Sequence, residues 1–248
     1  MKGISGYTLK IISILLLIWC NTFFMVAGEN EGNKRSIHGF FVDFDLLQPL
    51  FSALSPNKFG LNASIQANIT NTVFPILEIG YANYEGASDY AYIPDKIKQP
   101  DNYSYHVNGV YYKIGVDFNL LNKGLTKGNN TEKVSPIGYL GIRYGISPLN
   151  YQIENLLVED FYWEESYYFK AKGSTVGQWA EFTAGVKTPI YKNFCMGLNV
   201  QFRQFLYVRE KQTGDHVVRQ SYVPGFGDKN NDKWGFRYTI SYFFPFTK

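Results

Sequence analysis

The stretch FGLNASIQANIT, residues 59–70, alternates between apolar and polar or small side chains. Leu61 and Ile65 belong to the apolar set, and Asn62 and Gln66 belong to the polar set. Because successive side chains of a β-strand point to opposite faces, this pattern predicts a strand with one apolar and one polar face. A soluble sandwich turns its apolar face inward, whereas a membrane barrel turns that face toward lipid. The stretch alone does not decide between the two architectures.

Seven further segments repeat this alternation. Their positions are 39–46, 76–84, 110–120, 137–147, 180–187, 196–203 and 234–244. No segment shows a sustained helical period, and no second folded domain is indicated. We therefore predict an all-β chain with eight strands.

The connections between these segments alternate in length. The second and sixth segments are followed by tight turns at 71–72 and 189–193, and the fourth by a longer Gly- and Asn-rich connection at 122–135. The odd-numbered segments are followed by long connections at 48–57, 85–105, 148–177 and 209–232. Short periplasmic turns and long surface loops are typical of outer-membrane barrels. The chain is therefore predicted to form an eight-stranded antiparallel up-and-down transmembrane β-barrel of a Gram-negative outer membrane, with both termini periplasmic.

Ionisable residues within the segments lie on the polar face. They are five acids and five bases: Asp43, Asp45, Glu78, Lys113, Asp117, Arg143, Glu181, Lys187, Arg203 and Arg237. An eight-stranded barrel has an interior just wide enough for side chains to fill, and an unpaired buried charge is costly. We therefore expect these charges to pair into a lumen charge network that plugs the barrel, which argues against a porin. A proton or ion path is the alternative.

Two soluble architectures are also open at this point. A sandwich would expose the charged face to water, and a lipocalin-like barrel would be apolar inside. Aromatic residues near the segment ends favour the membrane, because such residues form girdles at its two interfaces. These residues are Phe74, Tyr81, Phe118, Tyr144, Phe194, Phe202, Trp234, Tyr242 and Phe244.

The N-terminus predicts export. Two lysines precede an apolar run at 11–18, and small residues follow it, as in a cleavable secretory signal. We predict a signal peptide at 1–28 and an outer-membrane barrel domain at 29–248. A retained anchor is an alternative, although the run ending at Val26 falls short of the ~20 residues that span a bilayer as a helix. A lipoprotein modified at Cys20 is another.

Charge and composition exclude some functions. Without the two signal-peptide lysines, 22 Lys and Arg balance 21 Asp and Glu, so no overall field favours nucleic acid. Cys195 would be the single mature cysteine, which excludes an intramolecular disulfide. The run from Asp228 to Asp232 begins like a calcium loop, but Lys233 stands where that loop requires glycine. No metal or cofactor is expected.

An enzyme would need a base beside a nucleophile or an activated water. His106 is the best candidate base, because Asp101 and Ser104 lie nearby in the sequence, but no nucleophile motif accompanies it. A surface hydrolase or acyltransferase therefore rests on the His106 region alone, and we expect no enzyme.

The connection at 154–169 is the most distinctive surface segment, with five acids and no base. Exposed aromatic residues between acids suit a protein or glycan partner, because Tyr and Trp supply contact area. The candidate contact residues are Phe161, Tyr162, Trp163, Glu164, Tyr167 and Tyr168. Alternatively, the segment packs on its neighbours, or its strands extend past the membrane.

Several motifs point to a family. The last strand, WGFRYTISYFFPF, resembles the C-terminal signal of outer-membrane barrels, although two residues follow Phe246. The chain resembles small barrels of the OmpA/OmpX type in architecture, and more closely a family of such barrels described as a domain of unknown function. The motifs that carry this resemblance are 115–117, 141–145, Trp179 with Glu181 and 185–187, 193–197, 224–227 and 234–236. The resemblance implies a barrel but no particular activity.

The sequence thus predicts a non-enzymatic barrel with a plugged lumen, in contact with outer-membrane lipid. It favours a monomer but does not determine the oligomeric state. We expect a role in envelope integrity, adhesion or partner binding. Transport of a small solute or lipid, through the lumen or a lateral opening, is the alternative.

Overall fold

The computed structural model describes residues 38–246, apart from 55–56, 88–90, 93–103, 122–124, 129–130, 161–164, 209–210, 214–215, 221 and 229–231. The predicted signal peptide lies outside these residues, so its boundary stays a prediction. Within the described part of the chain, no helix is long and apolar enough to cross a bilayer.

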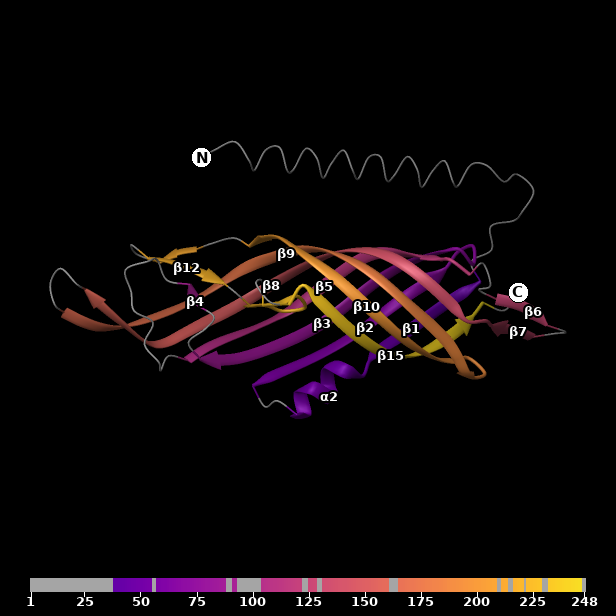
Figure 1. The fold of residues 1–248 in the computed structure, drawn as a ribbon, viewed down its shortest axis with the longest axis horizontal. Coiled ribbons are helices and arrows are strands. Elements are labelled where there is room, and N and C mark those ends of the chain that lie inside the picture. The colour runs from indigo at the N-terminus through magenta and orange to yellow at the C-terminus, as the bar shows by residue number, and fades with distance from the viewer. Residues whose placement is uncertain are drawn as a thin grey trace, which may run out of the picture. The chain divides into compact units, whose positions relative to one another are not determined.

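Eight strands form a closed barrel. They are β1 (Gly39–Asp45), β2 (Lys58–Asn68), β3 (Val73–Ala87), β5 (Ser104–Asn119), β8 (Ile137–Asp160), β9 (Glu165–Tyr191), β10 (Phe194–Val208) and β15 (Trp234–Pro245). Consecutive members of this set are antiparallel neighbours, and β15 closes the ring by pairing with β1, as Figure 1 shows. The predicted eight-stranded, up-and-down antiparallel barrel is confirmed.

The two ends of the barrel differ. The tight turns at Asn71 and Lys192 lie at one end, together with the start of β1 and the end of β15, where Gly39 pairs with Pro245. Asn71 and Lys192 have positive φ values of 60° and 48°, and the Asn68 carboxamide accepts a hydrogen bond from the Asn71 N–H at 2.9 Å. We call this the short-turn end and the opposite end the long-loop end.

The connections contain regular structure that the sequence did not predict. These elements are α2 (Leu47–Leu54), β4 (Ala91–Tyr92), β6 (Leu125–Gly128), β7 (Thr131–Val134), β11 (Lys211–Thr213), β12 (His216–Gln220), β13 (Tyr222–Val223) and β14 (Gly227–Asp228). The expected simple turn at 122–135 therefore contains a β6–β7 hairpin, and β12 pairs with both β11 and β4.

The prediction of a loop at 148–177 is wrong for most of that range. β8 has 24 residues and β9 has 27, and they pair from Ile137 opposite Lys187 to Asp160 opposite Glu165. One irregularity interrupts this ladder, between Ile153 and Leu156. Two adjacent strands that pair with each other satisfy their backbone hydrogen bonds even beyond the closed barrel. The connection therefore continues as a hairpin.

β1 is the shortest barrel strand, and α2 follows it directly. The Asp45 carboxylate accepts a hydrogen bond from the Leu47 N–H at 2.9 Å, which satisfies one of the free donors at the helix start. Pro49 lies in the first turn, where a missing N–H is tolerated. The hydrogen bond from the Leu47 N–H to the Asp45 carboxylate and the proline in the first turn together explain why the strand ends and a short helix begins.

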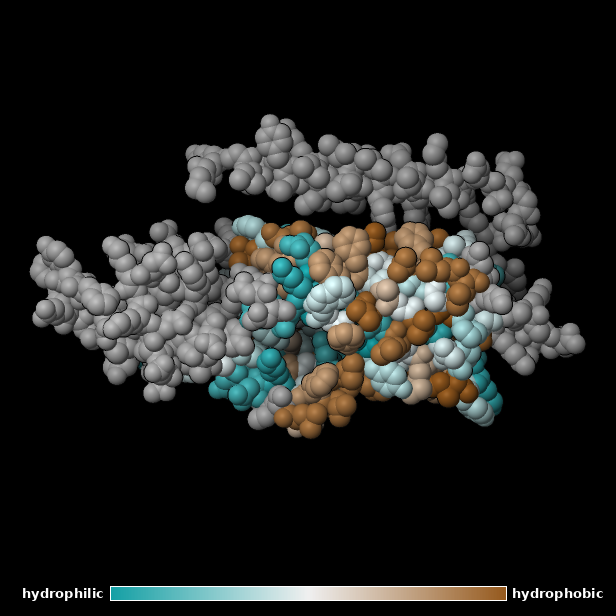
Figure 2. All heavy atoms as spheres, in the orientation of Figure 1, coloured by the Kyte–Doolittle hydropathy of each residue, from teal (hydrophilic) through white to brown (hydrophobic). Residues whose placement is uncertain are grey.

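The wall of the barrel separates apolar from charged residues. On β5, Ile114 is 62% exposed, while its neighbour Lys113 is 2% exposed and points into the lumen. β3 repeats this with Leu77 outside and Glu78 inside. Figure 2 shows apolar side chains covering much of the barrel wall and the region of α2.

Phe74 is an exception to the predicted girdles. It shares the parity of Glu78 along β3, and its side chain is buried inside the barrel. Most of the other predicted girdle residues, including Trp234, Phe118 and Tyr144, are exposed on the outer face.

Candidate functional site

The barrel interior is filled by three layers of side chains. A charged layer lies in the middle, and a mainly apolar, aromatic-rich cluster lies toward each end. Since inward-pointing residues alternate along every strand, each layer draws its members from several strands.

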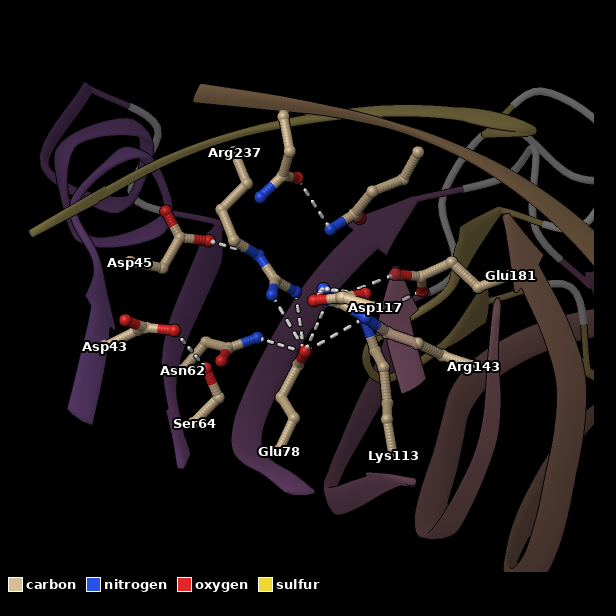
Figure 3. Close-up of polar contacts among 12 residues, drawn as sticks. Asp43, Asp45, Asn62, Ser64, Glu78, Lys113, Asp117, Arg143, Glu181 and Arg237 are labelled. Atoms are coloured by element: carbon tan, nitrogen blue, oxygen red, sulfur yellow. Dashed lines mark hydrogen bonds and ion pairs between the residues drawn. The ribbon is translucent and has the colours of Figure 1, made fainter. Parts of the chain in front are cut away.

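Glu78 of β3 is the centre of the charged layer. Arg237 of β15 donates to both of its carboxylate oxygens, at 2.8 and 2.6 Å. Arg143 donates to Oε2 at 3.1 Å, and the Lys113 ammonium lies 3.0 Å from Oε1. The Asn62 carboxamide donates a further hydrogen bond at 2.5 Å. Figure 3 shows these groups converging on one fully buried carboxylate.

The two neighbouring acids extend the layer around the barrel. Glu181 of β9 lies 2.9 Å from the Lys113 ammonium and 3.8 Å from Arg143. Asp117 accepts from Arg143 at 3.1 Å and from the Gln66 carboxamide at 2.8 Å. Arg143 therefore links three carboxylates.

A second group lies beside the first. The Lys187 ammonium donates to Asp43 and to the Gln66 carboxamide oxygen, both at 2.9 Å, and lies 4.4 Å from the centre of the Phe41 ring. Ser64 donates to Asp43 at 3.2 Å. Gln66 thus joins Lys187 to Asp117 and makes the two groups one network.

Nine of the ten predicted lumen charges are buried in this layer. They comprise five acids and four bases: Asp43, Asp45, Glu78, Asp117 and Glu181, with Lys113, Arg143, Lys187 and Arg237. Asp45 takes part through Arg237, at 3.4 Å. Arg203 lies elsewhere: it is half-buried near the long-loop end, and its guanidinium donates to the Trp234 carbonyl at 2.9 Å.

The arrangement is suited to blocking the lumen rather than conducting. Each of the nine charges has an ion-pair partner on another strand. Removing one partner from a buried pair costs about 3–5 kcal/mol, because the other charge is left uncompensated. The network therefore ties the strands together and opposes rearrangement of the interior.

The layer toward the long-loop end is aromatic. Trp179, Tyr105 and Tyr111 are fully buried there, and Trp179 meets Tyr111 edge-on, with ring centres 6.4 Å apart. Phe226, from the turn between β13 and β14, is also fully buried and lies 6.1 Å from Trp179. We call residues 222–228 the plug turn, since they insert an aromatic side chain into this layer.

The layer toward the short-turn end is smaller. It contains Phe41, Phe74, Tyr139, Cys195 and Phe243, all buried. Phe41 and Phe243 have ring centres 4.7 Å apart. The charged layer is thus enclosed on both sides by side chains that carry no charge.

Gly225 allows the plug turn to approach the barrel wall, and we predict a clear effect of Gly225→Ala. Its φ is +81°, and an added Cβ would lie 2.5 Å from Cγ of Tyr111. A left-handed conformation costs a non-glycine residue about 1–2 kcal/mol, and the overlap adds to this. We expect the turn to leave its seat and its amides to exchange faster with solvent in hydrogen-exchange mass spectrometry. Unchanged exchange in residues 222–228 would contradict this packing.

The surface-loop candidates are only partly described. Phe161, Tyr162, Trp163 and Glu164 lie outside the described residues. Tyr167 and Tyr168 belong to β9, opposite Val158 and Leu157 of β8. Their role as a contact surface therefore stays a prediction.

His106 lies in β5, where it pairs in register with Glu85 on one side and Gln152 on the other. Asp101, which suggested a catalytic pairing, lies outside the described residues. Neither register partner of His106 is a nucleophile of the serine or cysteine type.

Sequence reasoning missed the polar partners of the network and the plug turn. Alternation places Asn62 and Gln66 on the polar face of their strand, but it does not show which charge each one contacts. The signal for the plug turn was the motif Pro224–Gly225–Phe226–Gly227, in which an aromatic residue stands between two glycines. Such a turn brings its backbone close to another surface, because glycine adds no side chain.

The chemistry of the two faces identifies the environment of the barrel. An apolar exterior around a charged interior inverts the arrangement of a soluble protein, and a closed barrel satisfies all backbone hydrogen bonds within lipid. The two soluble architectures are thereby excluded, and the protein is an outer-membrane β-barrel.

Solved structures that are similar to the chain include the following three. The N-terminal β-barrel domain of Pseudomonas aeruginosa OprF is 11% identical with a TM-score of 0.38, over 84% of this chain and 98% of that one. Acinetobacter baumannii CarO2 is 12% identical with a TM-score of 0.34, over 86% and 100%. Ail, the attachment invasion locus protein of Yersinia pestis, solved with the heparin analogue sucrose octasulfate, is 10% identical with a TM-score of 0.29, over 83% and 93%.

Likenesses this weak do not indicate a shared role, and no curated protein matches the chain. A family model does match, and it bears out the resemblance seen in the sequence motifs. Residues 7–248 match the model described as a domain of unknown function (DUF6048), and the chain therefore belongs to that family.

Proposed function

We propose that the protein is a non-conducting barrel that acts as an anchored scaffold of the cell envelope and presents its long loops to a partner outside the cell. The observation that carries the first part is the filled lumen. A charged layer of paired residues lies between two layers of uncharged side chains, and Phe226 of the plug turn packs against Trp179.

The asymmetry of the connections supports an orientation. Short turns of outer-membrane barrels face the periplasm, and long loops face outward. The short-turn end, with both termini of the barrel, would therefore be periplasmic. The long-loop end would lie at the cell surface.

Planar-bilayer recording tests the closed lumen. We expect the folded protein to insert without discrete conductance steps, because paired charges and two layers of uncharged side chains fill the lumen in the part of the barrel that the structure describes. The inserted fraction is checked by the shift in gel mobility between unheated and boiled samples. Regular, ion-selective openings of the unmodified protein would overturn the proposal and favour transport.

The β8–β9 hairpin supports partner binding at the surface. A membrane strand needs about ten residues, so about 14 of the 24 residues of β8 lie outside the apolar band, which is roughly 45 Å of strand length. Replacing residues 154–170 by a short glycine–asparagine linker should abolish binding of the folded protein to printed glycan or protein arrays and leave gel mobility unchanged. If the shortened protein binds to the arrays as well as the unmodified protein does, the contact surface lies in another loop.

No catalytic role is part of the proposal. His106 is held in the ladder between β3 and β8, with Glu85 and Gln152 as its register partners. Among the described residues, no cluster of His, Cys, Asp and Glu could hold a metal ion.

A further inference from the structure

The barrel wall is incomplete beside β1 at the long-loop end. The pairing of β1 with β15 stops at Asp45 opposite Thr239, and its pairing with β2 stops at Phe44 opposite Ala63. Residues 234–238 of β15 and 58–62 of β2 therefore extend past β1 on either side. Five residues at ~3.3 Å each and two strand spacings of ~4.8 Å define a wall notch about 16 Å deep and 10 Å wide.

α2 covers this wall notch in place of a strand. An α-helix is about 10 Å in diameter, which matches the missing strand. The Gly60 N–H of β2, left free by the end of β1, donates to the Ser52 hydroxyl at 3.0 Å. On the other side, the Leu46 N–H donates to the Tyr238 carbonyl at 2.8 Å. Between these bonds, side chains rather than a continuous ladder close the wall.

A pocket of about 200 Å³ lies between α2 and the plug turn. Its lining includes Gln48, Phe51, Lys58, Arg203, Phe226 and Asp232. Sites that enclose a whole drug-sized ligand are larger, at ~300–1,000 Å³. This pocket is therefore of a size for one polar headgroup, with the rest of a ligand outside it.

The two cations of the pocket differ from those of the lumen. Arg203 lies 5.6 Å from the centre of the Phe226 ring, and Lys58 lies 5.3 Å from that of Tyr84. Neither makes an ion pair with a described residue, and Nε of Arg203 finds no acceptor there. The one acid of the lining, Asp232, accepts from the Asp228 N–H at 2.8 Å. Both cations thus lie near aromatic rings and make no ion pair with a described carboxylate, while Asp232 places one negative charge in the same lining.

The rim of the wall notch is apolar and continuous with the lipid-facing wall. On α2, Leu50, Phe51 and Leu54 are exposed, Leu54 by 72%. Phe59 of β2 and Phe236 of β15 are exposed on either side. Figure 2 shows apolar side chains over the region of α2. Acyl chains of the surrounding leaflet therefore meet the helix that covers the pocket.

We propose that the pocket binds the phosphate headgroup of a lipid in the membrane leaflet at the long-loop end, with its acyl chains lying over α2. The Arg203 guanidinium lies over the Phe226 ring and donates one hydrogen bond to the Trp234 carbonyl, and its remaining donors match phosphate oxygens. Lys58 adds a second positive charge at the rim. The site is lateral to the plugged lumen, so it requires no passage through the barrel and goes beyond the scaffold role.

Native mass spectrometry of the folded protein in neutral detergent tests this site. The probes are a short-chain phosphatidic acid, the diacylglycerol with the same chains, and inorganic phosphate. We expect the phosphatidic acid to bind about tenfold more tightly than the other two, since only it offers both the charge and the chains. Arg203→Gln should weaken its binding by about five- to tenfold, and the more exposed Lys58→Gln by about two- to fivefold.

Lys172→Gln is the matched control, because it removes one positive charge from an exposed position of β9 away from the pocket. The affinity of the Lys172→Gln variant for phosphatidic acid should equal that of the unmodified protein. Lys58→Gln carries the test if Arg203→Gln does not fold, since Lys58 is exposed. Equal binding of the diacylglycerol, equally tight binding of inorganic phosphate, or equal losses in Lys58→Gln and Lys172→Gln would each overturn the proposal.

Discussion

Replacing Glu78 by glutamine is expected to lower the free energy of unfolding by about 3–5 kcal/mol. Glutamine keeps the shape of the side chain but removes the charge that Arg237, Arg143 and Lys113 share. Three buried cations would then face a neutral amide. The measurement is urea unfolding of the barrel in lipid vesicles, followed by tryptophan fluorescence.

Glu85→Gln is the control, because Glu85 lies on the same strand but is exposed. It should change the free energy of unfolding by no more than about 0.5 kcal/mol. Equal stabilities of the Glu78 and Glu85 variants would show that the central network does not hold the barrel together.

Trp179→Ala is expected to cost a similar amount, about 3–5 kcal/mol, for a different reason. Trp179 is fully buried and packs against Tyr111 and Phe226. Its indole also fills the space that Gly145 leaves open, since a Cβ at Gly145 would overlap the ring. Truncation would remove the contact surface of the plug turn, which should then exchange its amides faster.

Trp234→Ala provides the comparison. Trp234 is 63% exposed on the outer face, where lipid can fill the space that truncation creates. We expect less than half of the loss seen for Trp179→Ala, measured by the same urea unfolding. An equal loss at the two positions would contradict the inner aromatic layer.

The strands were predictable because lipid and lumen impose opposite polarity on alternate side chains. Glu78 and Lys113 each stand between apolar neighbours, so the sequence states their face directly. The alternation of connection lengths was equally visible. The alternation of side chains is a local signal, and the alternation of connection lengths is read along the whole chain.

The features that the sequence did not predict depend on the position of a side chain along the barrel axis and on contacts between distant segments. The side chains of Arg203 and Arg237 both lie on the inner face of their strands, but only Arg237 reaches the central layer. Alternation indicates the face of a strand on which a side chain lies, and it does not indicate the position of that side chain along the barrel axis. The apolar residues of α2 do follow a helical spacing, at Leu47, Leu50, Phe51 and Leu54, but the helix has only eight residues, one of them proline, so the period is too short to be distinctive. Phe226 is buried only because Trp179 and Phe205 are folded around it.

The seam between the first and last strands has a consequence for assembly. Glu78 and Arg237 are 159 residues apart, and Lys187 and Asp43 are 144 apart. A chain whose last strand is not yet in place leaves Glu78 without Arg237, and its open sheet has not yet brought Asp43 of β1 to Lys187 of β9. Such an incomplete sheet is unstable, so insertion should proceed as one cooperative event that ends with β15. A chain truncated before that strand should be degraded rather than accumulate.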